Sequence, residues 1–158
     1  MRDSLGPALT DAEIEKLRQS EIRLDRDGRF WHEGVEVTHQ GLKGAFYRWL
    51  DRDPDGRFVL RLDDKRFVYL EVDDAPFLIA SLRLEGPRIF VRLSDDSDEE
   101  LDYESVQLRD GRAYAKVKRG RFEARLSNAA WGALGERIED RGGTPVLRTP
   151  TGVHALSA

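Results

Sequence analysis

Alternating apolar and polar residues mark a strand near the middle of the chain, around which we arrange the rest. The segment 67–77, FVYLEVDDAPF, alternates as expected of a strand whose successive side chains point to opposite faces. Asp73 and Asp74 then end the strand, because aspartate is depleted in strands and favours turns. Pro76 lacks the N–H that continued pairing requires, and Phe77 begins another apolar run. We therefore expect a sharp corner between two strands.

The first hairpin is indicated by an Asp-Gly pair at 27–28. Such a pair favours a two-residue turn, since both central residues must adopt positive φ. With a loop of that length, Leu24 faces Trp31 across the ladder, and His32 falls on the opposite face beside Arg23. The turn length therefore decides which side chains of this hairpin share a face.

Helical periodicity is clearest after Thr38, the predicted N-cap of the first long helix. Apolar residues then recur at the i, i+3, i+4, i+7 and i+8 positions of one helix face, namely Leu42, Ala45, Phe46, Trp49 and Leu50. Thr10 and Glu13 have the spacing of a capping box, which predicts a short N-terminal helix at 11–19.

A last helix is predicted after Ser127 or Asn128, either of which can cap it. Trp131, Leu134 and Ile138 would share one face of this helix. Glycine commonly follows a helix C-terminus, so we expect the helix to continue up to the Gly-Gly pair that follows.

The remaining pattern is one of short strands, which we expect at 57–62, 66–72, 78–84, 89–93, 105–108, 113–117 and 121–126, with a closing pair at 145–147 and 152–156. The predicted fold is α+β. It consists of two small β-rich lobes built from antiparallel hairpins and a meander, each with one packed helix, plus the short N-terminal helix. The expected divisions are 1–19 for the tail and short helix, 20–86 for the N-terminal lobe and 87–158 for the C-terminal lobe.

Composition narrows the class of protein. The 158 residues are 39% hydrophobic and 9% aromatic, which is enough to build a core. With 30 acidic and 26 basic residues the net charge is −4, which argues against a dedicated duplex-DNA binder. There is no cysteine, no apolar run of the roughly 18 residues that a membrane span needs, and no apolar signal segment in MRDSLGPALT. We expect a cytoplasmic protein with no membrane partner.

Four stretches together resemble a known family. They are DRDGRFWHEG at 25–34, VDDAPF at 72–77, KRGRFEARLSNAAWGALGERIED at 118–140 and GVHAL at 152–156. Their order and spacing are similar to those of uncharacterised bacterial proteins grouped as "domain of unknown function 1285". Asp73 stands where that family more often has glutamate. The resemblance implies a compact α+β architecture and supplies no catalytic signature.

The first candidate site joins the hairpin to the corner. Trp31, His32 and Glu33 lie in the hairpin, and Asp73 and Asp74 lie in the corner. A histidine and carboxylates could bind a ligand, hold a metal ion or share acid–base chemistry if the hairpin packs beside the corner. The alternative is that the histidine is an ordinary hydrogen-bonded surface residue.

The second candidate is a calcium loop. Asp51, Asp53, Asp55 and Gly56 match the first half of the D-x-D-x-D-G pattern. Position 12 of such a loop is Leu62 here, where a bidentate glutamate is required. The alternative to a weak calcium site is an acidic turn in which aspartate and glycine supply the turn geometry. No other cofactor is predicted.

The third candidate is a basic hairpin. Lys116, Lys118, Arg119 and Arg121, with aromatic residues among them, could bind an anion or a single nucleic-acid strand. The acidic run at 95–104, DDSDEELDYE, precedes this hairpin and is expected to be a solvated, mobile loop. The alternative is that these two blocks of opposite charge neutralise each other.

No nucleophile elbow or phosphate-binding glycine loop occurs in the sequence. We therefore expect a non-enzymatic cytoplasmic binding or regulatory module, with an unidentified small ligand or protein as its partner. The alternatives are a metal-dependent hydrolase at the first candidate site and an anion or nucleic-acid binder at the third. Homodimerisation through an exposed strand edge is left open by the sequence.

Overall fold

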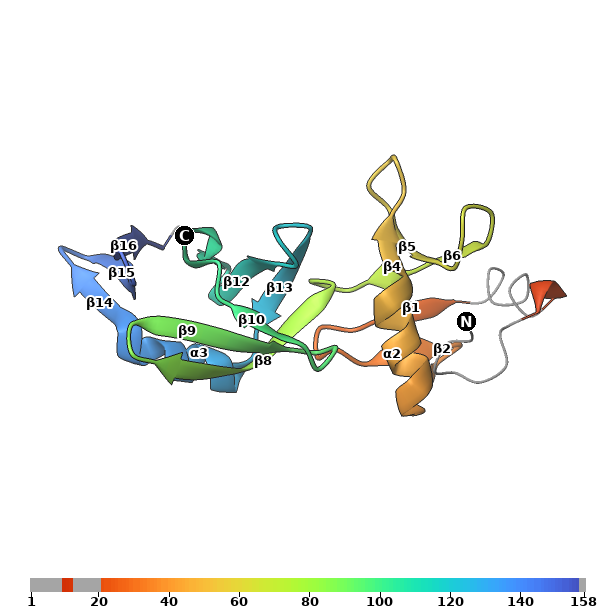
Figure 1. The fold of residues 1–158 in the computed structure, drawn as a ribbon, viewed down its shortest axis with the longest axis horizontal. Coiled ribbons are helices and arrows are strands. Elements are labelled where there is room, and N and C mark those ends of the chain that lie inside the picture. The colour runs from red at the N-terminus through yellow and green to blue at the C-terminus, as the bar shows by residue number, and fades with distance from the viewer. Residues whose placement is uncertain (1–9, 13–20, 157–158) are drawn as a thin grey trace. The chain divides into compact units, whose positions relative to one another are not determined.

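The computed structural model describes residues 10–12 and 21–156, and it divides into two compact units, Met1–Asp74 and Ala75–Ala158 (Figure 1). We predicted the division at 86–87, which is too late by one strand. The strand β8 (Phe77–Glu85) pairs with β9 and β13 of the second unit, so it belongs there. Most of the N-terminal helix predicted at 11–19 lies outside the described residues.

Over residues 21–74, the first unit contains two small sheets and the helix α2. One sheet has the order β3-β2-β1-β7, and the other has the order β4-β5-β6. The helix α2 leads directly into β4 and contacts β5. The bounds are β1 (Ile22–Leu24), β2 (Phe30–His32), β3 (Val35–Glu36), α2 (Gln40–Trp49), β4 (Leu50–Arg52), β5 (Phe58–Arg61), β6 (Phe67–Tyr69) and β7 (Glu71–Val72).

The β1–β2 hairpin has a register one residue away from the predicted one. Arg23 pairs with Trp31, while Leu24 pairs with Phe30. The Asp25 N–H bonds to the Arg29 carbonyl, which leaves three residues in the loop instead of two. Positive φ at the last loop residue, followed by resumed pairing, is the usual form of such a hairpin. The prediction that Leu24 faces Trp31 is therefore wrong.

The core of the first unit forms around Phe30. Its ring makes edge contacts with Phe46 and Tyr47 of α2, with centroids 5.1 and 5.0 Å apart. The helix begins one residue later than predicted, because His39 is its N-cap and accepts the Leu42 N–H through Nδ1 at 3.1 Å. A packed aromatic cluster thus joins the helix to the first hairpin.

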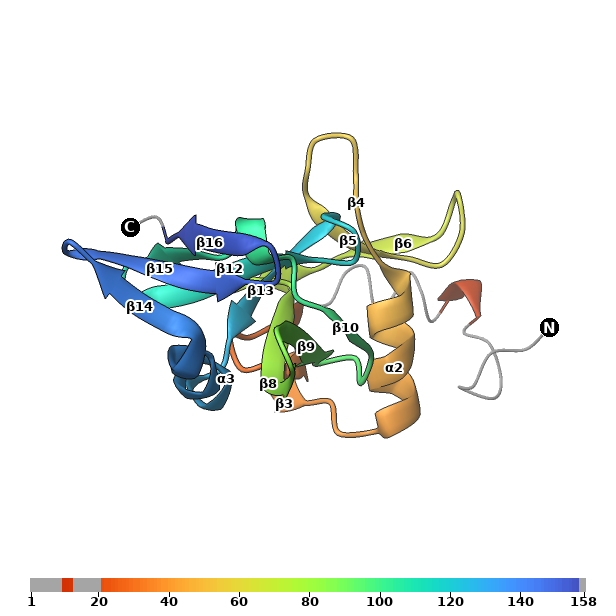
Figure 2. The same ribbon diagram turned by 60° about the vertical axis from the view of Figure 1, so that its left-hand side comes forward.

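The second unit is built on a six-stranded sheet with the order β10-β9-β8-β13-β12-β11, together with a three-stranded sheet, β14-β15-β16. The helix α3 lies against β8 and β13 (Figure 1 and Figure 2). The bounds are β9 (Arg88–Leu93), β10 (Asp98–Glu100), η1 (Tyr103–Ser105), β11 (Gln107–Arg109), β12 (Arg112–Val117), β13 (Phe122–Leu126), α3 (Asn128–Leu134), η2 (Gly135–Arg137), β14 (Ile138–Arg141), β15 (Thr144–Thr149) and β16 (Gly152–Ala155).

Two predictions for the second unit are wrong and one is confirmed. Ser127 does cap α3, accepting the Ala130 N–H through Oγ at 3.0 Å. The helix stops at Leu134, however, and Ile138 begins a strand. The acidic run at 95–104 is also not a simple loop, because it contains β10, which pairs with β9. In both cases strand pairing overrides the local pattern.

The described residues, mostly strands with two helices, agree with an α+β class. The buried aromatic side chains of the described residues are Phe30, Phe46, Tyr47, Phe77, Tyr114 and Phe122. Across residues 10–12 and 21–156, none of the helices has the length and apolar character needed to cross a membrane.

Candidate functional site

The hairpin and the corner of the first unit do pack side by side. β7 runs parallel to β1, with Arg23 beside Glu71, and the Asp73 N–H bonds to the Leu24 carbonyl at 3.0 Å. Arg23 ion-pairs with Asp73, with Nη1 and Oδ2 2.5 Å apart. The same guanidinium lies 5.8 Å from the centre of the Trp31 ring. The sequence therefore placed Trp31 and Asp73 in one neighbourhood correctly, but their shared neighbour is an arginine.

His32 does not join this cluster. It pairs with Ile22, so its side chain is on the opposite face of the sheet from that of Arg23. Its Nε2 atom is buried and lies 3.8 Å from the Glu33 carboxylate, beyond hydrogen-bond distance. The site predicted from Trp31, His32, Glu33, Asp73 and Asp74 is therefore divided between two faces. Within the described residues, no His, Asp and Glu side chains form a group of three that could hold a metal ion.

The predicted calcium loop is a hairpin turn between β4 and β5. Asp53 Oδ1 accepts the backbone N–H groups of Asp55 and Arg57 at 3.0 and 2.9 Å. Asp51 instead contacts Arg61, with Oδ2 and Nε 3.3 Å apart. Asp53 thus serves the turn, as the alternative interpretation proposed, while Asp51 is engaged with Arg61 and does not join it as a calcium ligand.

The turn between β1 and β2 is built in the same way. Asp25 Oδ1 accepts the N–H groups of Asp27 and Arg29, both at 2.9 Å, and Oδ2 accepts the indole N–H of Trp31 at 2.8 Å. Burial raises the pKa of the Asp25 carboxyl, but these hydrogen bonds lower it by more, so the pKa lies below its usual value. The D-x-D-G-R sequence is therefore a turn element that this chain uses twice.

The basic hairpin of the second unit is largely matched by the acidic run. Lys118 Nζ contacts Asp95 Oδ2 at 2.7 Å and Ser97 Oγ at 2.9 Å. The Lys118 backbone N–H reaches the Glu99 carboxylate at 3.2 Å. Burial raises the pKa of the Asp95 carboxyl, but hydrogen bonds from Lys118 and Ser97 lower it by a larger amount. The pKa of Asp95 therefore lies below its usual value. Lys118 is thus part of the structure of its own unit.

The other bases of this hairpin line a pocket of about 650 Å³. Its wall is mixed in charge and consists of Glu99, Glu100, Asp102, Lys116, Lys118, Arg119, Gly120 and Arg121. Lys116 also lies opposite Glu123 in the β12–β13 ladder. An anion entering this pocket would meet carboxylates as well as cations, which weakens the case for the anion site predicted here.

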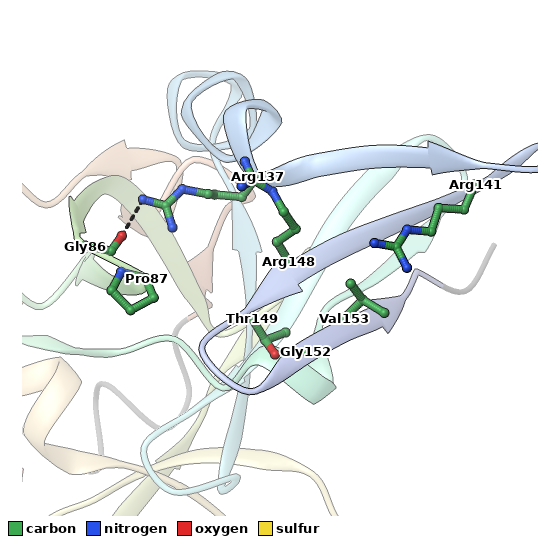
Figure 3. Close-up of a pocket in the computed structure, with 8 residues that line it drawn as sticks. All are labelled: Gly86, Pro87, Arg137, Arg141, Arg148, Thr149, Gly152 and Val153. Atoms are coloured by element: carbon green, nitrogen blue, oxygen red, sulfur yellow. Dashed lines mark hydrogen bonds between the residues drawn. The ribbon is translucent and has the colours of Figure 1, made fainter.

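A different pocket of the second unit, about 750 Å³ in volume, is lined by positively charged side chains and by no negatively charged one (Figure 3). It is lined by Gly86 and Pro87 of the β8–β9 turn, Arg137 of η2, Arg141 of β14, Arg148 and Thr149 of β15, and Gly152 and Val153 of β16. Three of these side chains are arginines and none is acidic. The cationic side chains come from three successive elements of the chain.

Strand alternation brings the three arginines together. The turn at 142–143 places Arg141 opposite Thr144 and Ile138 opposite Leu147. By the same register Arg137, one residue before β14, is level with Arg148. Positions 137, 139 and 141 therefore share a face with position 148, while Leu147 on the other face is fully buried.

Protein contacts hold the arginines in place. Arg137 Nη2 donates to the Gly86 carbonyl at 2.6 Å, and Arg148 Nη2 donates to the Glu136 carbonyl at 2.7 Å. The Glu139 carboxylate bridges Arg141 and Arg148, with Oε1 3.2 Å from Arg141 Nη2 and Oε2 3.1 Å from Arg148 Nε. Each guanidinium has five N–H groups, so these contacts orient the side chains without exhausting their donors.

Sequence reasoning missed this site. The segment 137–141 was assigned to a helix, in which Arg137 and Arg141 would lie one turn apart and Arg148 elsewhere. The available signal was the Gly-Gly pair at 142–143, which also favours a two-residue hairpin. Counting outward from it gives the β14–β15 register, which ends with Ile138 opposite Leu147, next to Arg137 and Arg148.

Comparison with solved structures finds this architecture in two bacterial proteins. A DUF1285 family protein from Silicibacter pomeroyi matches with a TM-score of 0.74 and 20% sequence identity, over 86% of this chain and 79% of that chain. A DUF1285 family protein from Shewanella baltica matches with a TM-score of 0.61 and 20% identity, over 74% of this chain and 91% of the other. The chain has the fold of DUF1285 proteins. The resemblance noted in the sequence is thus confirmed at the level of the fold.

Searches of family models and of curated proteins give no match. A DUF1285 fold does not carry a function by itself, so the function has to be argued from the side chains of this chain.

Proposed function

We propose that the protein is a non-enzymatic binding module that takes a small anionic ligand in the pocket lined by Arg137, Arg141 and Arg148. The observation that carries this proposal is that three guanidiniums line one pocket whose wall has no carboxylate. Guanidinium is the group best suited to carboxylate and phosphate oxygens, because its planar fork can donate two parallel hydrogen bonds.

The way in which the arginines are held supports binding. Ordering a long side chain costs conformational entropy, and contacts to Gly86 and Glu136 carbonyls supply that order before a ligand arrives. The pocket volume of about 750 Å³ is within the range of ligand sites, roughly 300–1,000 Å³. A ligand larger than a single inorganic ion therefore fits.

The chemistry of the lining favours binding over catalysis. The side chains that face the pocket are those of arginine, threonine, proline and valine. Arginine stays protonated at neutral pH, so it stabilises negative charge but does not exchange protons as a general base. We assign the pocket to recognition of the ligand and not to its conversion.

Titration with inorganic tripolyphosphate tests the proposal. A ligand that binds the folded state raises the unfolding temperature and gives a saturable heat signal. We expect both signals for the wild-type protein and at least a tenfold weaker affinity for Arg137→Gln and Arg148→Gln. A control variant, Arg112→Gln, removes an exposed arginine of β12 and should bind like the wild type.

The same titration separates this pocket from the basic hairpin. If binding is lost in Arg119→Gln but kept in Arg148→Gln, the anion site is at 116–121 and the proposal fails. If adding an anion changes the unfolding temperature of neither the wild type nor any variant, neither site binds anions of this kind and the proposal fails. Circular dichroism of each variant verifies that it is folded.

The proposal includes a place in the bacterial cytoplasm, and the two solved proteins that share the fold come from bacteria. Fractionation of the source cells, with detection of the protein in the cytoplasmic fraction, tests that assignment. A protein partner or a homodimer is compatible with a ligand pocket, and light scattering of the purified protein with and without tripolyphosphate would detect a homodimer.

A further inference from the structure

The arginine pocket has two separate centres of positive charge. The first is Arg137, whose contact among the described residues is the Gly86 carbonyl, a neutral acceptor. The second is the pair Arg141 and Arg148, joined by the Glu139 carboxylate. Two guanidiniums and one carboxylate leave one net positive charge there, so each centre carries about the same excess.

The two centres lie at different places along the pocket. Figure 3 shows Arg137 extending toward Gly86, whereas Arg141 extends along β14 toward Val153. Arg148 pairs with Val153 through the backbone of the β15–β16 ladder, and its side chain extends toward the base of Arg137, where Nη2 donates to the Glu136 carbonyl. The guanidiniums therefore do not converge on one point, as they would around a single phosphate.

Apolar surface accompanies each centre. Pro87 follows Gly86 at the first, and Val153, with 46% of its surface exposed, lies at the second. An exposed valine on a sheet face gains from contact with an aliphatic segment of a ligand. The lining thus offers two charged ends and apolar contacts near both.

Glu139 shows the kind of group that the second centre accepts. Its two carboxylate oxygens contact two different arginines, Arg141 through Oε1 and Arg148 through Oε2. The remaining N–H groups of the two arginines are able to receive a second oxyanion, because each guanidinium has five donors. A ligand carboxylate or phosphate would neutralise the one positive charge of Arg141 and Arg148 that Glu139 does not balance.

We infer that the ligand is a small organic dianion, with one oxyanion at each end of an apolar spacer. One end binds Arg137, and the other binds Arg141 and Arg148. This inference rests on the proposed function and specifies its ligand. Two carboxylates or two phosphates have the required chemistry, and a single anion would fill only one centre.

A length series of ligands tests the inference. Isothermal titration would compare malonate, glutarate, pimelate and azelate with heptanoate, which has the length of pimelate but one carboxylate. Joining two groups that bind together raises the affinity through effective concentration. We expect one length to bind at least tenfold more tightly than heptanoate, and shorter and longer members to bind less well. Bisphosphonates of the same lengths decide whether phosphate-type ends are preferred.

Variants then locate each end of the ligand. Arg137→Gln should reduce the best dicarboxylate to the affinity of heptanoate, and Arg141→Gln should do the same from the other end. Val153→Ser, a surface change, should weaken the dicarboxylates, whereas Arg112→Gln, outside the pocket, should leave dicarboxylate and tripolyphosphate binding unchanged.

The results separate the inference from the function on which it rests. If tripolyphosphate binds in an arginine-dependent way but dicarboxylates and bisphosphonates of all lengths bind no better than their monoanionic counterparts, the dianion inference is overturned while anion binding stands. If tripolyphosphate also fails to bind, both are overturned.

Discussion

The two basic regions of the second unit differ in how their charges are matched. In the hairpin at 116–121 the bases are adjacent in sequence, and the ammonium of Lys118 is paired with Asp95 and hydrogen-bonded to Ser97. In the arginine pocket the three arginines are spread over 137–148. Arg141 and Arg148 contact the carboxylate of Glu139, and Arg137 and Arg148 each donate to a backbone carbonyl. Both groups of bases line a pocket, but the wall at the hairpin contains carboxylates, whereas the wall of the arginine pocket contains none.

The difference shows that a count of bases in a segment says little about binding. What matters is whether acids from other segments reach them. The acidic run at 95–104 provides Asp95 and Glu99 to the hairpin, because β10 pairs with β9 and brings them there. No comparable acidic run faces the arginine pocket within its lining.

The largest effect is expected from Lys118→Met. This change keeps the length of the side chain but removes the ammonium, leaving Asp95, whose side chain is only 17% exposed, without its ion-pair partner. Losing hydrogen bonds to a charged, largely buried group costs about 2 kcal/mol of unfolding free energy. Urea denaturation of the wild type and the variant measures this loss of unfolding free energy.

Arg148→Met is the matched change in the pocket. Its side chain is 49% exposed and its ion pair is at the surface, so we expect a loss below about 1 kcal/mol. Equal destabilisation of the two variants would contradict the distinction between a structural cluster and a binding pocket.

Acid should weaken the hairpin selectively. The folded-state pKa of Asp95 lies below its ordinary value of 3.8, so its ion pair stabilises the protein above that value. The contribution is lost as the pH falls through the lower folded-state pKa. The difference in unfolding free energy between the wild type and Asp95→Asn should therefore shrink between about pH 5 and pH 3.

Arg112→Gln serves as the reference for that measurement. Arginine does not titrate in this range and this exposed arginine of β12 is outside the acidic cluster, so the variant should keep the pH profile of the wild type. A constant difference between wild type and Asp95→Asn at every pH would show that Asp95 contributes through packing alone.

The smallest effect is expected from Glu139→Gln. Removing this negative charge leaves three arginines without a carboxylate partner, while the amide oxygen still accepts one hydrogen bond. Tripolyphosphate affinity should rise about threefold, the scale of a surface ion pair. A fall in affinity would mean that orientation of Arg141 and Arg148 by Glu139 matters more than its charge.

Local signals in the sequence identified several elements correctly. Ser127 caps α3 because a serine hydroxyl can accept an exposed N–H of the first turn, a contact within three residues. The corner after β7 and the apolar stripe of α2 were also predicted from neighbouring residues alone. These features depend on interactions that are short in sequence, so the sequence contains them directly.

The errors occur where pairing with a neighbouring strand decides the conformation. Ile138 lies at a helical spacing from Trp131 and Leu134, but pairing with β15 makes residues 138–141 a strand. The acidic run forms β10 because β9 offers an open edge. The Asp25 carboxylate sets the loop length of the first hairpin, which changes the face on which Trp31 and His32 lie.

The sequence by itself determined the α+β class, the Ser127 cap and the corner after β7, since these follow from propensities and contacts between near neighbours. Only the tertiary structure decided which charges are matched. Lys118 meets Asp95 through the pairing of strands far apart in the chain, and Arg137 meets Gly86 across 51 residues. Charge matching depends on such distances in space, which a linear pattern does not contain.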